Sequence, residues 1–157
     1  IMGRKHEKVV IGWTESVEFP DWNIGAIRAK IDTGARTSAL HVEDIEETGR
    51  GRVRFDVILH RAKRDRHVHV TAPITRRARV RSSNGEYEER YFVETILSLG
   101  PLRKRIEISL VDRGEMRFRM LLGRTALAGV WVDVAHANLL GRKARRKSAK
   151  RRPVRRS

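Results

Sequence analysis

The residues best suited to chemistry stand in one short stretch, Asp32-Thr33-Gly34-Ala35, which follows an apolar run over 24–31. This order predicts a strand that ends in a tight loop and presents one carboxylate. Gly34 allows the backbone to turn where a side chain would clash, and the Thr33 hydroxyl can hold the loop through hydrogen bonds. The alternative is an ordinary surface turn, because Asp and Gly are common turn residues.

A second segment, residues 116–125, contains Leu121-Leu122-Gly123-Arg124. Apolar and arginine side chains alternate over 116–120, which is the period-2 pattern of a half-buried strand. We therefore expect a strand over 117–122 and a short helix over 125–128.

With both segments present, the chain resembles the retropepsin-like aspartic proteases, which carry Asp-Thr-Gly-Ala after an apolar strand and a distant apolar-apolar-Gly followed by Arg and a helix. It is closer still to a bacterial family labelled ATP-dependent zinc proteases, whose fold is retropepsin-like. The motifs of that family correspond here to residues 30–38, 112–113 and 116–124, and the resemblance covers most of residues 9–134. It implies an all-β fold, a retropepsin-like closed barrel with one short helix after the late glycine.

The resemblance also implies an aspartic endopeptidase with Asp32 as the catalytic residue. This chemistry needs two carboxylates about 3 Å apart that share one proton. The chain has one Asp-Thr-Gly and is too short for a second lobe of that kind. The mechanism therefore requires a homodimer in which Asp32 of two chains meets on a two-fold axis, with a peptide or protein as substrate.

The resemblance assigns roles to the neighbours of Asp32. Thr33 would brace the dimer, and Gly34 and Ala35 would offer backbone to the substrate. The expected supporting loop consists of Leu122, Gly123 and Arg124.

One residue departs from the viral pattern, because Arg36 stands where viral retropepsins carry an acid that pairs with the later Arg. Arg124 is therefore expected to meet Asp112, Glu115 or Asp133. Asp112 and Arg113 match a family motif and would form an active-site or dimer ion pair, or only a turn before Gly114. Residues 61–66 are the expected tip of a flap over the site, with a plain surface hairpin as the alternative.

No cofactor is expected. The chain lacks His-Glu-x-x-His and a Gly-rich phosphate loop. His67 and His69 would share one face of a strand, which can chelate a metal, but His41, His60 and His136 are scattered and no third ligand is identifiable. The alternative is solvated histidines. In the resembling family the link to ATP comes from neighbouring ATP-grasp ligases that add glutamates to a ribosomal protein, which suggests by analogy a role in trimming or regulating such modifications.

Composition divides the 157 residues into a flexible start (1–8), one protease domain (9–141) and a disordered basic tail (142–157). The net charge is +16, and ten cations without any acid lie in the tail, which leaves +6 for the rest. Such a tail can contact RNA or the ribosome through phosphates, or simply be solvated. The absence of cysteine fits a reducing, cytoplasmic location, and no apolar run is long enough for a membrane helix.

Turn signals separate many short alternating segments, as in an all-β barrel or sandwich. Residues 15–22 are expected to be a connection. The expected strands are 9–13, 24–31, 37–42, 53–59, 67–70, 78–81, 87–97, 106–111, 117–122 and 130–134. Two other functions stay open: a peptide-binding module of the same fold that does not cleave, and a zinc hydrolase as the family label says.

Overall fold

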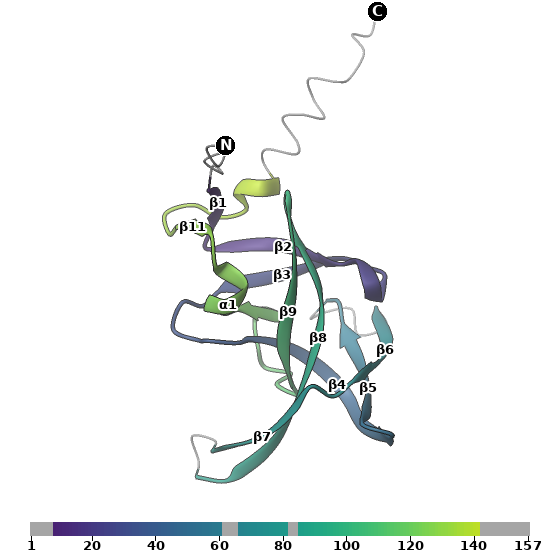
Figure 1. Cartoon of the computed structure of the whole chain (residues 1–157). Helices are drawn as coiled ribbons and strands as arrows, with labels where there is room; N and C mark the ends of the chain where they lie inside the picture. The colour runs from purple at the N-terminus through teal and green to yellow at the C-terminus, as the bar shows by residue number, and fades with distance from the viewer. Residues whose placement is uncertain (1–7, 61–65, 82–84, 142–157) are drawn as a thin grey trace, which may run out of the picture.

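The computed structural model describes residues 8–60, 66–81 and 85–141, and strands make up most of them (Figure 1). The prediction of a mainly β fold is thus confirmed. The strands are β1 (Val9–Gly12), β2 (Thr14–Phe19), β3 (Ile24–Ile31), β4 (Ser38–Gly49), β5 (Arg52–Ile58), β6 (His67–Pro73), β7 (Arg76–Arg81), β8 (Tyr87–Leu99), β9 (Leu102–Val111), β10 (Met120–Leu122) and β11 (Val130–Asp133). A short 3-10 helix η1 (Pro20–Trp22) follows β2, and helix α1 (Arg124–Leu127) follows β10.

The strand pairings of the main sheet return to their starting point. The order β10-β3-β2-β8-β9-β4 is closed by a further pairing of β4 with β10, so these strands form a ring. β5 and β6 continue outward from β4, and β7 pairs with β8 outside the ring. The short β10 is the link that closes the ring, because it pairs in parallel with β3 and antiparallel with β4.

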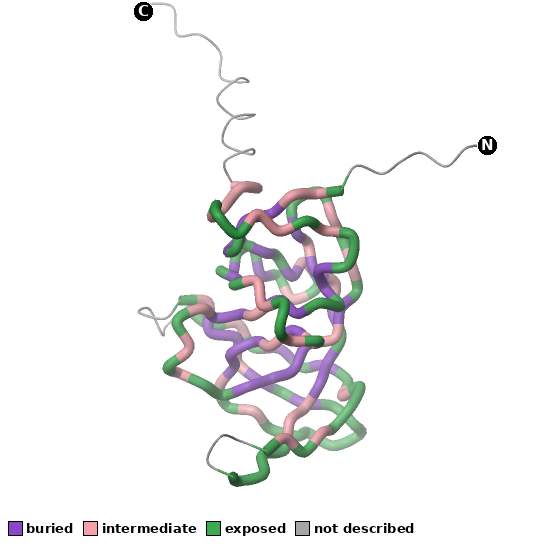
Figure 2. Tube along the Cα trace, turned by 90° about the vertical axis from the view of Figure 1, so that its left-hand side faces the viewer, coloured by how far each residue is buried: buried purple, intermediate pink, exposed green. Residues whose placement is uncertain are grey.

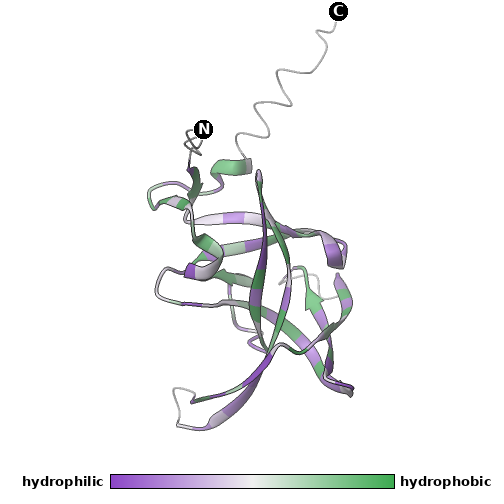
Figure 3. Ribbon diagram, viewed as in Figure 1, coloured by the Kyte–Doolittle hydropathy of each residue, from purple (hydrophilic) through white to green (hydrophobic). Residues whose placement is uncertain are grey.

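Apolar side chains fill the interior of this arrangement. In β5, Val53, Phe55 and Val57 are fully buried, while the intervening Arg54 is exposed and Asp56 is half-buried, which is the alternation of a strand with one core face. Buried stretches lie in the interior of the molecule, and its lower end is mostly exposed (Figure 2). The hydrophilic colour gathers on the β7–β8 hairpin, which projects from the lower end (Figure 3).

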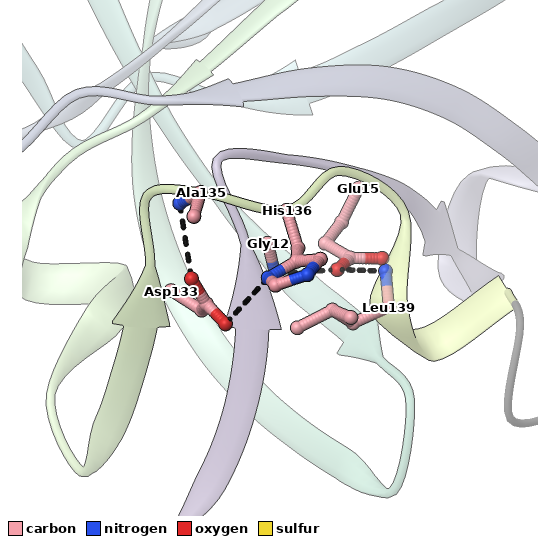
Figure 4. A network of polar contacts seen from close by, with 6 residues as sticks. All are labelled: Gly12, Glu15, Asp133, Ala135, His136 and Leu139. Carbon is pink, nitrogen blue, oxygen red and sulfur yellow. Dashed lines mark hydrogen bonds and ion pairs between the residues drawn. The ribbon is translucent and has the colours of Figure 1, made fainter.

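A buried carboxylate ties the two ends of the described chain together. β1 pairs in parallel with β11, from Val9 opposite Val130 to Gly12 opposite Asp133. Glu15 is 0% exposed, and its Oε2 accepts the N–H groups of Gly12 (2.7 Å) and Leu139 (2.9 Å) (Figure 4). Its Oε1 accepts the N–H of Leu140 at 3.2 Å.

The structure corrects several expected boundaries, among them the end of β6 at Pro73 instead of 70 and the starts of β7 at Arg76 instead of 78 and of β9 at Leu102 instead of 106. Residues 15–22, expected to be a connection, contain β2 and η1, because Glu15 is a polar residue on a buried face. The strand expected over 117–122 is only Met120–Leu122. Arg119 is buried instead of solvated, and its guanidinium donates to the carbonyl oxygens of Gly114 and Met116, which bends the preceding residues into a loop. β4 extends to Gly49, past the expected end at 42.

The expected flexible start and basic tail lie almost wholly outside the described residues, since 1–7 and 142–157 are not among them. Within the described residues, the helices are too short and too polar to cross a bilayer.

Candidate active site

Asp32 lies directly after β3, in a loop closed by its own hydrogen bonds. Its backbone N–H donates to the carbonyl oxygen of Leu122 (2.9 Å). Its Oδ1 accepts the N–H of Gly34 at 3.1 Å, and its carbonyl accepts the N–H of Ala35 at 3.3 Å. Asp32 is half-buried, whereas Thr33 and Gly34 are exposed. The loop therefore holds one carboxylate in place and leaves the next two residues open to solvent.

The late glycine segment packs against this loop. The Gly123 N–H donates to Ser38 Oγ (3.1 Å), and the Arg124 N–H donates to the Ala35 carbonyl (2.8 Å). A Cβ on Gly123 would lie 2.7 Å from the carbonyl carbon of Thr37. Only glycine permits two backbone segments to approach this closely. The structure thus brings together the two segments on which the sequence argument depends.

Arg124 has a different partner from the acids expected for it. Its Nη1 donates to the Thr33 carbonyl at 3.0 Å, and no ion pair within the described residues joins it to Asp112, Glu115 or Asp133. With Arg36 in place of an acid, the guanidinium reaches the backbone of the Asp32 loop instead. The side chain therefore braces the loop through a carbonyl.

A groove of about 860 Å³ opens beside Asp32. Its lining comes from the Asp32 loop, from the start of β4, and from β7, β8 and β9. Apolar lining is supplied by Ala78, Val80, Phe92, Ile106 and Val111, among others. A groove with apolar walls and a few polar groups is the usual form of a ligand site.

Arginines outnumber acids around the groove. The lining includes Arg36, Arg76, Arg90, Arg105 and Arg113. The acids among the described lining residues are Asp32 and Glu107. Glu107 is already engaged, because Arg76 donates to its Oε1 at 2.8 Å. The groove therefore keeps an excess of positive charge that suits an anionic ligand.

Arg90 and Arg113 carry much of that excess. The Nε of Arg90 is buried and has no hydrogen-bond partner. Burial, together with the charge of Arg113, lowers the pKa of Arg90. Two guanidinium groups that face one groove without an acid between them favour a bound carboxylate or phosphate.

The ion pair considered for Asp112 and Arg113 is not formed in the described residues. Instead, the Arg113 backbone N–H donates to Nδ1 of His41 at 3.0 Å. His41 is fully buried, and burial followed by the charge of Arg119 lowers its pKa. His41 therefore positions the loop that carries Arg113 into the groove. Sequence analysis left this histidine among scattered ones, because its partner lies 72 residues away.

The hairpin that lines the groove is β7–β8, through Arg76, Ala78, Val80, Arg90 and Phe92. Of the flap tip expected over 61–66, residues 61–65 lie outside the described residues. The strands that flank that tip, β5 and β6, contribute nothing to the described lining. The groove position therefore favours the β7–β8 hairpin as the covering element.

His67 and His69 lie on one face of β6, as their spacing predicts, with ring centroids 4.9 Å apart. The residue that sequence analysis missed is Asp56, which pairs in register with His69 across the hairpin. Strand alternation alone could have placed Asp56 on an outward face, but not opposite a particular histidine. None of the three lines the groove.

Comparison with known proteins gives a family for this chain. The model of the family "RimB-like", described as "Retropepsin-like aspartic endopeptidase RimB", matches residues 10–143. A protein of Shewanella pealeana named "Probable alpha-L-glutamate ligase" is 35% identical over 142 residues, which are 87% of this chain and 31% of the relative. A protein of the same name from Parasynechococcus marenigrum is 36% identical over 138 residues, 85% of this chain and 30% of the relative. The chain thus spans about a third of the length of these curated relatives.

A solved structure shares the fold. The crystal structure of a protein of unknown function from Legionella pneumophila superposes with a TM-score of 0.72. The two sequences are 23% identical, and the match covers 85% of this chain and 99% of the other.

Proposed function

The chain belongs to the RimB-like family of retropepsin-like aspartic endopeptidases, and from that premise we propose that it hydrolyses peptide bonds as a homodimer with Asp32 as its catalytic residue. The observation that carries the proposal is the Asp32 carboxylate at the edge of a groove, where its Oδ1 accepts the Gly34 N–H and the Asp32 backbone N–H donates to the Leu122 carbonyl. In this proposal the ring of strands is the retropepsin-like closed barrel.

The second carboxylate comes from another copy of the chain. Among the described lining residues the other acid is Glu107, which is bonded to Arg76. Asp32 of the partner subunit would complete the pair, because two carboxylates at close range share one proton. Thr33 and Gly34 are exposed, so in this proposal they would meet the partner loop.

The proposed reaction proceeds with proton transfers between these two groups. The ionised Asp32 takes a proton from a water molecule, whose oxygen bonds to the carbonyl carbon of the substrate. The protonated acid donates its hydrogen to the carbonyl oxygen. Collapse of the tetrahedral intermediate breaks the C–N bond, and the leaving amine takes the proton that came from water. The carboxylate that had donated its hydrogen takes it back from the oxygen as the C=O bond re-forms. The projecting β7–β8 hairpin would cover the substrate during these steps.

The arginines of the groove indicate an acidic substrate. Arg90 and Arg113 form no ion pair within the described residues, the Nε of Arg90 is buried without a hydrogen-bond partner, and desolvation strengthens the attraction of such groups for carboxylates. The relatives carry this segment in a longer protein whose printed name is a probable alpha-L-glutamate ligase. We infer that the substrate is a peptide rich in glutamate, of the kind that such a ligase would produce.

The test is cleavage of two matched peptide sets, one rich in glutamate and one with glutamine at the same positions. The wild type should cleave the glutamate set faster, and Asp32→Asn should lower kcat by at least about 100-fold. Asp21→Asn is the charge-matched control, since Asp21 is exposed in η1. Arg90→Met should raise KM for the glutamate set by about tenfold with little change for the glutamine set.

Three results would contradict the proposal. Asp32→Asn with wild-type kcat would remove the catalytic role of the residue. Activity lost to a chelator and restored by zinc would indicate metal-dependent hydrolysis. Binding of glutamate-rich peptides without turnover, by a chain that sediments as a dimer, would leave a peptide-binding module.

A further inference from the structure

Three side chains with metal-ligating atoms converge on the β5–β6 hairpin, apart from the groove. Asp56 lies opposite His69 in the antiparallel register, and Ile58 lies opposite His67. Because side chains alternate along a strand, Asp56, His67 and His69 project from the same face. One ligand atom from each of the three lies within 4.8 Å of the others.

We propose that Asp56, His67 and His69 bind one divalent transition-metal ion, with Zn²⁺ as the best match. Two imidazole nitrogens and one carboxylate oxygen form a donor set that suits Zn²⁺, Co²⁺, Ni²⁺ or Cu²⁺. Water would occupy the remaining coordination position. Harder ions such as Mg²⁺ and Ca²⁺ prefer oxygen ligands and fit this set poorly.

The β5–β6 hairpin combines a backbone that is fixed by core packing with a histidine side chain that is exposed. On the opposite face of β5, Phe55 and Val57 are fully buried, which fixes the backbone of the hairpin. The His69 side chain is 70% exposed, so its ring can turn toward an ion without disturbing the core. Nδ1 of His69 contacts Oδ1 of Asp56. A bound ion would lie between these two side chains and accept a lone pair from each.

The other candidate cluster in the described residues, His41 with Glu43 and Asp112, does not suit a metal. Nδ1 of His41 accepts the Arg113 N–H. A neutral imidazole has one lone pair available for such a bond, so its hydrogen is on Nε2. That nitrogen lies 3.7 Å from Oε1 of Glu43 and, because it carries the hydrogen, has no lone pair for a cation.

The proposed ion has no part in peptide hydrolysis. Asp56, His67 and His69 do not line the groove that contains Asp32. β6 is the last strand of the sheet order, so an ion bridging Asp56 and the two histidines would fasten this edge strand to β5. Its binding is therefore independent of the proposed function.

The test is titration of the metal-free full chain with Zn²⁺ by calorimetry and with Co²⁺ by visible absorption. We expect one ion per chain, d–d absorption of Co²⁺ in a nitrogen-oxygen site, and a higher Tm with excess Zn²⁺. His67→Ala and His69→Ala should each weaken binding at least about tenfold, and Asp56→Asn should weaken it as well. Lowering the pH from 7.5 to 5.5 should weaken it too, because protons compete for the imidazoles.

The matched control is His136→Ala, because His136 is also exposed and also pairs with a carboxylate, Asp133, at 2.8 Å. It should bind Zn²⁺ like the wild type. No saturable binding up to millimolar Zn²⁺ would overturn the proposal. Equal affinity in the wild type and in His67→Ala or His69→Ala would overturn it too, provided that the variants keep the Tm of the metal-free wild type.

Discussion

Replacement of Glu15 by glutamine tests how much one buried carboxylate contributes to the fold. Glu15 is fully buried and accepts three backbone N–H groups. One of these comes from Gly12 on β1, and the other two come from Leu139 and Leu140 near the far end of the described chain. Glutamine has almost the same shape, so the substitution changes the charge and one acceptor and leaves the packing intact.

The expected loss of stability depends on which of the three hydrogen bonds a glutamine at position 15 can keep. Its single oxygen can serve Gly12 and Leu139, which share Oε2 of Glu15, but its NH₂ group then faces the N–H of Leu140. A hydrogen bond to a charged group contributes about 1.5–3 kcal/mol, and an unpaired buried donor costs about 1–3 kcal/mol. These two energies cannot simply be added, because the lost hydrogen bond is also the one that leaves the Leu140 N–H unpaired. The expected loss in the free energy of unfolding is about 2–4 kcal/mol, or about 5–15 °C in Tm.

The assay is urea denaturation followed by Trp fluorescence, with Glu18→Gln as the matched control. Glu18 lies on the same strand but is exposed, so its substitution removes the same charge without touching a buried bond. We expect Glu18→Gln to stay within about 0.5 kcal/mol of the wild type. If Glu15→Gln were equally neutral, the carboxylate would not be the acceptor that holds residues 139 and 140, and the reasoning would fail.

Two further substitutions probe the site. Gly123→Ala places a Cβ 2.7 Å from the Thr37 carbonyl carbon, so we expect it to lower the free energy of unfolding by about 1–3 kcal/mol and to abolish peptide cleavage. The control Gly25→Ala, whose Cβ would have no atom within 4 Å, should leave cleavage unchanged. Equal effects of the two substitutions would contradict the argument from close approach at Gly123. Because the pKa of His41 is lowered from 6.5, the folded state binds fewer protons than the unfolded state, and the free energy of unfolding should decrease as the pH falls below 6.5. His41→Asn, which retains an acceptor for the Arg113 N–H, should show a flatter pH profile by chemical denaturation, and parallel profiles would refute this account.

The local pattern of apolar and polar residues was sufficient to predict a strand that buries one face in the core. The run over 24–31 was predicted at the bounds that β3 has, since its apolar residues end at Asp32. The pattern failed at β2, because Glu15 looks like a solvent-facing residue until its partners, 124 and 125 positions away, are known. It also failed at Arg119, which is buried by bonds to the carbonyls of its own loop.

The candidate site also has parts that the sequence predicted and parts that it could not predict. The Asp32 loop and the Gly123 segment were predicted from their motifs, and the structure places them in contact. The charge of the groove could not be predicted, because its arginines come from separate segments that only the fold brings together. Asp56 escaped notice for the same reason, as its position opposite His69 depends on the register of the β5–β6 hairpin.

The parallel pairing of β1 with β11 has a mechanical consequence. The chain enters at Val9 and leaves beyond Asp133, which lie at opposite ends of this pair. A force that pulls these ends apart would act along both strands, so their evenly spaced hydrogen bonds would be loaded together in shear instead of opening one after another. The bonds of Glu15 to residues 139 and 140 add resistance on the C-terminal side. This geometry would resist a force applied between Val9 and Asp133.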